Sequence, residues 1–63
     1  MMRVLIVEDD RFFFELIRTF LENYDVEVCN AENAAVAMQL LDKNNFDLIT
    51  VDNGLPDIEG HEL

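Results

Sequence analysis

The stretch DLITVDNGLPDIEG, residues 47–60, decides how the rest of the sequence is interpreted. Its first part, Asp47 to Val51, is typical of a short strand and runs directly into Asp52. Turn-forming residues follow at once, among them Gly54 and Pro56. A strand that ends in a carboxylate and then enters a tight loop places that carboxylate at one edge of a sheet, so Asp52 is a candidate functional residue.

The residues upstream predict two further strands and two helices. The run RVLIV, residues 3–7, is typical of a strand buried on both faces, and VEVCNA, residues 26–31, predicts a second strand. Helices are expected over about residues 10–23, with Asp9 or Asp10 as N-cap, and over about residues 32–43. This alternation predicts an α/β fold: a truncated flavodoxin-like, doubly wound parallel sheet, β-α-β-α-β, with strand order 2-1-3.

The first predicted helix has a wide apolar face. The stripe expected to meet the sheet recurs at helical spacing and comprises Phe13, Leu16, Ile17, Phe20 and Leu21. In the triplet FFF, residues 12–14, we assign Phe13 to the core and expect at least one of its two neighbours to be partly exposed. An exposed phenylalanine here indicates either an interface or simply a wide core stripe, and the sequence leaves both open.

Composition excludes several classes of protein. The 63-residue chain carries 14 acidic and 4 basic residues, a formal net charge of −10, which disfavours nucleic-acid binding, although an acidic mimic of DNA stays an alternative. No apolar stretch is long enough to predict a membrane span. The lone Cys29 cannot form an intramolecular disulfide and favours a reducing, cytoplasmic location.

Acidic residues follow two of the predicted strands. Glu8 and Asp9 come after the first strand, and Asp52 ends the third. Strands one and three are neighbours in the order 2-1-3, so the three carboxylates should meet at one edge, where they suit Mg²⁺ and a phosphoryl-accepting Asp52. The Gly54 carbonyl could approach the ion, because no side chain shields it. Taken singly, these acids could instead be helix caps and turn residues.

Here a resemblance adds to the pattern. VLIVEDD together with DLITVDNGLPDIEGHEL resembles the response-regulator receiver domain of two-component signalling, over all 63 residues. The resemblance implies that Asp52 is the phosphoacceptor, that Glu8, Asp9, Asp52 and the Gly54 carbonyl bind Mg²⁺, and that the phosphodonor is a histidine kinase. It implies a phosphoprotein that is modified, not an enzyme with turnover.

The family's domain is about twice as long, so residues 1–63 correspond to its N-terminal half. The missing half supplies a Ser or Thr and a Lys that respond to the phosphoryl group. This chain has no Ser, its one lysine is Lys43, and neither Thr19 nor Thr50 is suitably placed. We therefore expect slow phosphorylation without a switch. The alternative is a non-enzymatic module that docks a partner or forms a homo-oligomer, most simply a dimer through the exposed edge of strand three.

Overall fold

Three parallel strands form the sheet of this protein, in the spatial order β2-β1-β3. A computed structural model describes residues 1–51. In chain order the elements are β1 (Met2–Val7), α1 (Arg11–Leu21), β2 (Val26–Ala31), α2 (Ala34–Lys43) and β3 (Leu48–Val51). The predicted fold class, element order and strand order are confirmed. Strand three begins one residue later than expected, at Leu48, because Asp47 uses its side chain to bond β1.

The central strand β1 pairs with both neighbours. Its register sets Val7 beside Ala31 of β2 and Val51 of β3. The four residues of β1 that lie deepest in the sheet are almost fully buried: Val4, Leu5, Ile6 and Val7. This burial on both faces is the reason for the continuous aliphatic run in the sequence.

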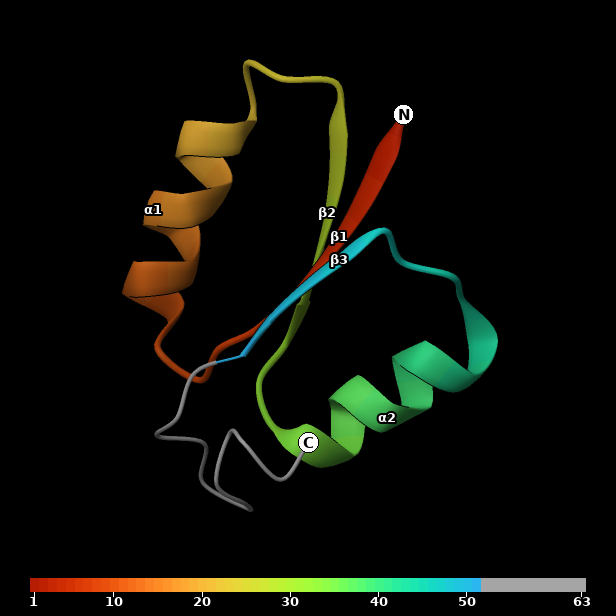
Figure 1. Ribbon diagram of the computed structural model, residues 1–63. Coiled ribbons are helices and arrows are strands. Elements are labelled where there is room, and N and C mark those ends of the chain that lie inside the picture. Colours follow the sequence, from red (N-terminus) through yellow and green to blue (C-terminus); the bar gives the residue numbers. More distant parts are fainter. Residues whose placement is uncertain (52–63) are drawn as a thin grey trace.

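The two helices cover opposite faces of the sheet (Figure 1). On the α1 face, Val4 and Ile6 pack against Phe14. On the α2 face, Leu5 and Val7 pack against small side chains, Ala31, Ala34 and Ala37. Alanine at these positions lets α2 approach the strands closely. Among residues 1–51, neither helix is long and apolar enough to cross a membrane.

Capping side chains fix where the helices begin. Asp10 has an extended backbone and accepts hydrogen bonds from the backbone nitrogens of Phe12 and Phe13, at 2.9 and 3.3 Å. Asn33 caps α2 in the same way, accepting from Val36 N at 2.9 Å. These bonds satisfy amides that have no partner within the helix. Of the two candidates for the first cap, the structure therefore selects Asp10.

The assignment of Phe13 to the core was wrong. Phe14 is 6% exposed and faces the sheet, whereas Phe13 is 50% exposed and Phe12 is 74% exposed. The stripe that contacts β1 and β2 consists of Phe14, Ile17 and Leu21, spaced i, i+3, i+7. Since successive helix residues turn by about 100°, the parallel stripe through Phe13 is directed away from that contact.

Candidate functional site

The carboxyl ends of β1 and β3 lie next to each other. Val7 and Val51 are partners in the parallel pairing, and each is the last residue of its strand. The residues that follow in sequence are Glu8 and Asp52. Asp52 lies outside the described residues, as does Gly54, so their roles stay predictions. Strands β1 and β3 therefore end at the same edge of the sheet, and Glu8 follows β1 there.

Glu8 is 5% exposed and is the buried charged residue of the described part of the chain. Its backbone nitrogen donates to Ala31 O at 2.9 Å, which ties it to the end of β2. Its carboxylate oxygen Oε2 accepts from Asp10 N at 3.2 Å. A buried carboxylate is costly unless it has polar partners, so these bonds define its orientation.

The three acidic residues that follow β1 have different environments and contacts. Asp10 is engaged as the N-cap of α1, where its Oδ1 atom accepts two backbone bonds. Asp9, which lies between the buried Glu8 and Asp10 in the sequence, is exposed to solvent. Asp9 is therefore the exposed carboxylate between the cap and the buried Glu8, and the metal-binding role of Glu8 and Asp9 stays a prediction.

The donor chemistry of this turn fits a hard cation. Within residues 1–51, no three His, Cys, Asp or Glu side chains gather closely enough to hold a metal ion. Glu8 and Asp9 supply carboxylate oxygens, which Mg²⁺ prefers, and Mg²⁺ commonly needs one or two protein carboxylates with water completing its shell. The two described acids are thus compatible with Mg²⁺, and the expected third, Asp52, follows β3 in sequence.

A shallow hollow of about 200 Å³ adjoins Glu8. It lies between α1 and the ends of β1 and β3 and is mostly apolar. Within residues 1–51, the hollow is lined by Ile6, Val7, Glu8, Phe13, Ile17, Thr50 and Val51. Phe13 thus lines the hollow beside the acidic turn. This position accounts for its partial exposure and is not part of the core.

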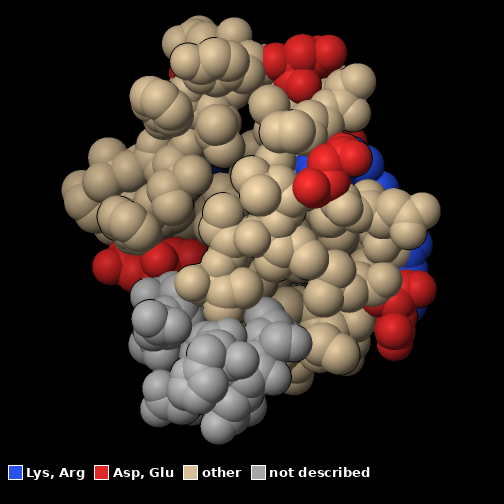
Figure 2. All heavy atoms as spheres, viewed as in Figure 1, with Lys and Arg blue, Asp and Glu red and all other residues tan. Residues whose placement is uncertain are grey.

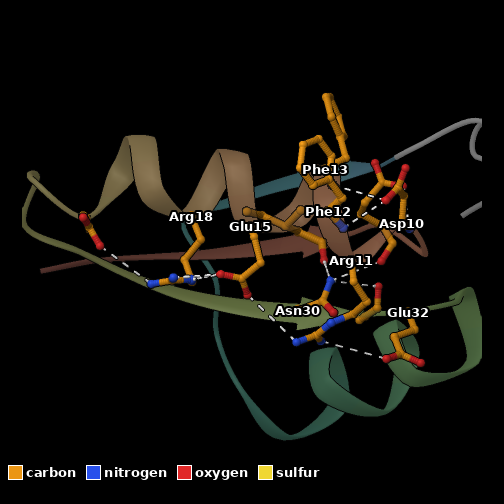
Figure 3. A network of polar contacts seen from close by, with 12 residues as sticks. Asp10, Arg11, Phe12, Phe13, Glu15, Arg18, Asn30 and Glu32 are labelled. Carbon is orange, nitrogen blue, oxygen red and sulfur yellow. Dashed lines mark hydrogen bonds and ion pairs between the residues drawn. The ribbon is translucent and has the colours of Figure 1, made fainter.

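Reasoning from the sequence missed Asn30, one residue before the end of β2. Its Nδ2 atom donates to three backbone oxygens, Ile6 O at 3.0 Å, Glu8 O at 3.3 Å and Ala31 O at 3.4 Å. Figure 3 shows Asn30 beneath the start of α1, among the polar residues of that region. A polar residue on the otherwise apolar α1 side of β2 was the available signal.

The remaining polar contacts near α1 are exposed. Arg11 forms ion pairs with Glu15 at 3.9 Å and Glu32 at 4.0 Å. Arg18 Nε donates to Glu15 Oε1 at 2.8 Å, and this hydrogen bond, aided by the charge of Glu15, raises the pKa of Arg18. Solvated pairs of this kind contribute little to stability and form no binding site.

Two residues weighed as switch residues can also be located. Thr50 lies in β3 beside Ile6 and lines the hollow. Lys43 ends α2, and the next residue, Asn44, contacts the Arg3 side chain near the start of β1. Lys43 therefore lies near the end of the sheet where the strands begin, whereas Glu8 lies at the end where β1 stops.

Comparisons with known proteins agree with this geometry. The family model for the response regulator receiver domain matches residues 4–63. The chain is 38% identical over 64 residues to the two-component response regulator ARR10 of Arabidopsis thaliana, covering 98% of this chain and 12% of that protein. It is 36% identical over 61 residues to the nisin biosynthesis regulatory protein NisR of Lactococcus lactis subsp. lactis, covering 97% of this chain and 27% of that protein.

Solved structures show the same fold. The receiver domain of the Francisella response regulator 1452 superimposes with a TM-score of 0.88 at 28% identity, over 95% of this chain and 50% of that chain. The complex of histidine kinase ThkA with the response regulator protein TrrA contains a match with a TM-score of 0.91 at 34% identity, over 98% of this chain and 53% of the other. The chain thus spans about half of each solved chain.

Proposed function

Because the chain belongs to the response-regulator receiver domain family, we propose that it accepts a phosphoryl group on Asp52. One observation carries this proposal: β1 and β3 are adjacent and parallel, and their carboxyl ends lead into Glu8–Asp9 and Asp52. Residues 1–63 then correspond to the N-terminal half of a receiver domain, as their coverage of the solved chains suggests.

The chemistry follows from the acids at this edge. Glu8 and Asp9, with Asp52 and the Gly54 carbonyl, are the residues that would hold Mg²⁺, and a bound cation supplies positive charge beside the transferring phosphoryl oxygens. A carboxylate oxygen of Asp52 forms the new bond to phosphorus, while the bond between phosphorus and the donor breaks and the donor keeps that electron pair. The product is the acyl phosphate of the protein itself, so the chain acts as a phosphoacceptor and not as an enzyme with turnover.

A histidine kinase is the proposed donor. Support comes from the solved match in which a response regulator is in complex with a histidine kinase. We place the reaction in the cytoplasm because the single cysteine of the chain fits a reducing compartment. The net charge of −10 disfavours nucleic acid as a direct partner.

The 63-residue polypeptide should accept the phosphoryl group slowly. Its one lysine ends α2, at the sheet edge opposite Glu8, and it has no serine. The Lys that pairs with the phosphoryl group and the Ser or Thr that responds to it belong, in the family, to the second half of the domain. For the 63-residue polypeptide taken by itself, we therefore propose phosphoryl acceptance without a conformational switch.

Self-association is the second candidate function, and the exposed outer strand β3 is the feature that supports it. In the described chain this strand pairs with β1 on one side, and its apolar residues are exposed: Leu48 by 48%, Ile49 by 41% and Val51 by 37%. Uncharged side chains cover most of the face seen in Figure 2. An exposed apolar edge strand is prone to pair with another chain.

Incubation with a small phosphodonor and Mg²⁺ tests the proposed function. Intact-mass spectrometry should show slow addition of one phosphoryl group to the wild type and none to Asp52→Ala. Asp42→Ala is the matched control, because Asp42 is an exposed acid on α2. Labelling of Asp52→Ala at the wild-type rate would show that Asp52 is not the acceptor.

A further inference from the structure

Asn30 connects β2 to the turn that carries the acidic residues. It is the register partner of Ile6, and the amide that donates to Ile6 O at 3.0 Å also reaches Glu8 O at 3.3 Å. Glu8 lies one residue beyond the last paired residue of β1. The side chain of Asn30 therefore extends the bonding between the two strands past the point where their backbone register ends.

Glu8 is consequently held by at least three hydrogen bonds. Its nitrogen is bonded to Ala31 O, its carbonyl accepts from Asn30, and its carboxylate accepts from Asp10 N. Asn30 contributes the bond to the carbonyl, which belongs to the peptide group that joins Glu8 to Asp9. The orientation of this peptide group sets the direction in which the two carboxylates leave the backbone.

We propose that Asn30 is a positioning residue for the divalent-cation site, holding the Glu8–Asp9 peptide so that both carboxylates are set for the ion. This inference rests on the proposed function. Groups that orient metal ligands through hydrogen bonds typically change metal affinity by about 10- to 100-fold when they are removed. Asn30 acts on the backbone of the ligands, so we expect an effect near the lower end, about tenfold.

A purely structural role for Asn30 predicts a different experimental result. If its amide only joins two strands, removing it lowers the stability of the fold but leaves the affinity of the folded protein for Mg²⁺ unchanged. Affinity must therefore be measured on folded protein. Asn44 offers the matched control, because its Nδ2 also donates to a backbone oxygen, Leu40 O at 3.0 Å, and it is likewise half-buried, near the start of β1.

The experiment compares the full 63-residue wild type with Asn30→Leu, Asn30→Thr and Asn44→Leu. Leucine keeps the same number and branching of side-chain heavy atoms without a donor, and threonine is a good strand former without an amide. Mg²⁺ is titrated by calorimetry at a temperature where circular dichroism shows each variant folded. We expect Mg²⁺ to bind about tenfold more weakly to both Asn30 variants and with unchanged affinity to Asn44→Leu.

The other outcomes overturn the inference in distinguishable ways. Wild-type affinity in the Asn30 variants refutes the positioning role and leaves the proposed function standing. An equal loss in the Asn30 and Asn44 variants shows general loosening of the sheet, which also refutes it. A wild type that does not bind Mg²⁺ overturns the metal site of the proposed function and the role of Asn30 together.

Discussion

Arg3 and Asp47, 44 positions apart in the sequence, join the amino ends of β1 and β3 by two reciprocal hydrogen bonds. Arg3 N donates to Asp47 Oδ2 at 2.7 Å, and Asp47 N donates to Arg3 O at 2.8 Å. The side chain of Asp47 thus replaces a backbone acceptor at the point where β3 begins. This pair sets the register that places Val7 beside Val51 at the other end of the strands.

Replacing Asp47 with alanine should destabilise the protein by about 1 kcal/mol, because one charge-assisted bond is lost from an exposed position where water competes. Urea unfolding followed by circular dichroism measures the change. Asp42→Ala removes the same charge from a residue for which the described structure gives no polar contact, so it should be nearly neutral. Equal effects of the two substitutions would mean that the Arg3–Asp47 pair does not secure β3.

The corrected orientation of α1 predicts unequal effects for adjacent phenylalanines. Phe14→Leu should cost about 1 kcal/mol, because Phe14 is buried between Val4 and Ile6 and its ring lies under the Arg11 guanidinium at 5.7 Å. Phe13→Leu should cost clearly less, since half of that side chain already faces solvent. The same urea titration compares them, and a larger loss for Phe13 would restore the original assignment.

The pattern of residues was sufficient for the fold but not for the rotation of α1. Strand runs and helical periodicity determine element order, and parallel pairing then leaves few topologies. The apolar arc of α1 is wider than the contact with β1 and β2 requires. Periodicity alone therefore could not show whether Phe13 or Phe14 faces the sheet, because both stripes have the same spacing.

The candidate site could be predicted only in part from the sequence. Glu8 and Asp9 could be located because residues after a strand lie at the sheet edge. The separate duties of Asp9 and Asp10 depend on backbone angles at the start of α1, which composition does not encode. Asn30 was missed because its importance comes from its register with Ile6, a relation between strands 24 positions apart.

Magnesium should stabilise the wild type by mass action. At a concentration about ten times the dissociation constant the gain is about 1.4 kcal/mol, which raises the melting temperature of a domain this small by roughly 5–10 °C. Asp9→Asn should abolish the rise, and its metal-free form should be no less stable, because one negative charge leaves a crowded turn. Differential scanning calorimetry with and without Mg²⁺ measures both quantities.

Asp10→Asn is the control for this magnesium effect. It removes the same charge from the neighbouring position, and asparagine caps a helix about as well as aspartate. The rise in melting temperature should therefore persist. If millimolar Mg²⁺ does not raise the melting temperature of the wild type, or if both variants lose this rise equally, Glu8 and Asp9 do not form a specific cation site.

Within residues 1–51, β3 pairs with β1 alone, and this predicts that the 63-residue polypeptide forms a dimer. β3 carries no lysine or proline, the residues that commonly protect an edge from pairing. Two copies joined antiparallel about a two-fold axis would give a continuous sheet in the order 2-1-3-3′-1′-2′, with one isologous interface. Because each copy carries a net charge of −10, added salt should strengthen the association.

Light scattering coupled to size-exclusion chromatography at micromolar concentration decides between dimer and monomer. Ile49→Lys puts a charge on β3, where the side chain is 41% exposed, and should shift the population to monomer. Met38→Lys introduces the same charge at an exposed apolar position on α2, away from the edge, and should leave the dimer intact. A wild type that is folded and monomeric at these concentrations would refute pairing through β3, and equal dissociation by both lysines would show that the association does not depend specifically on β3.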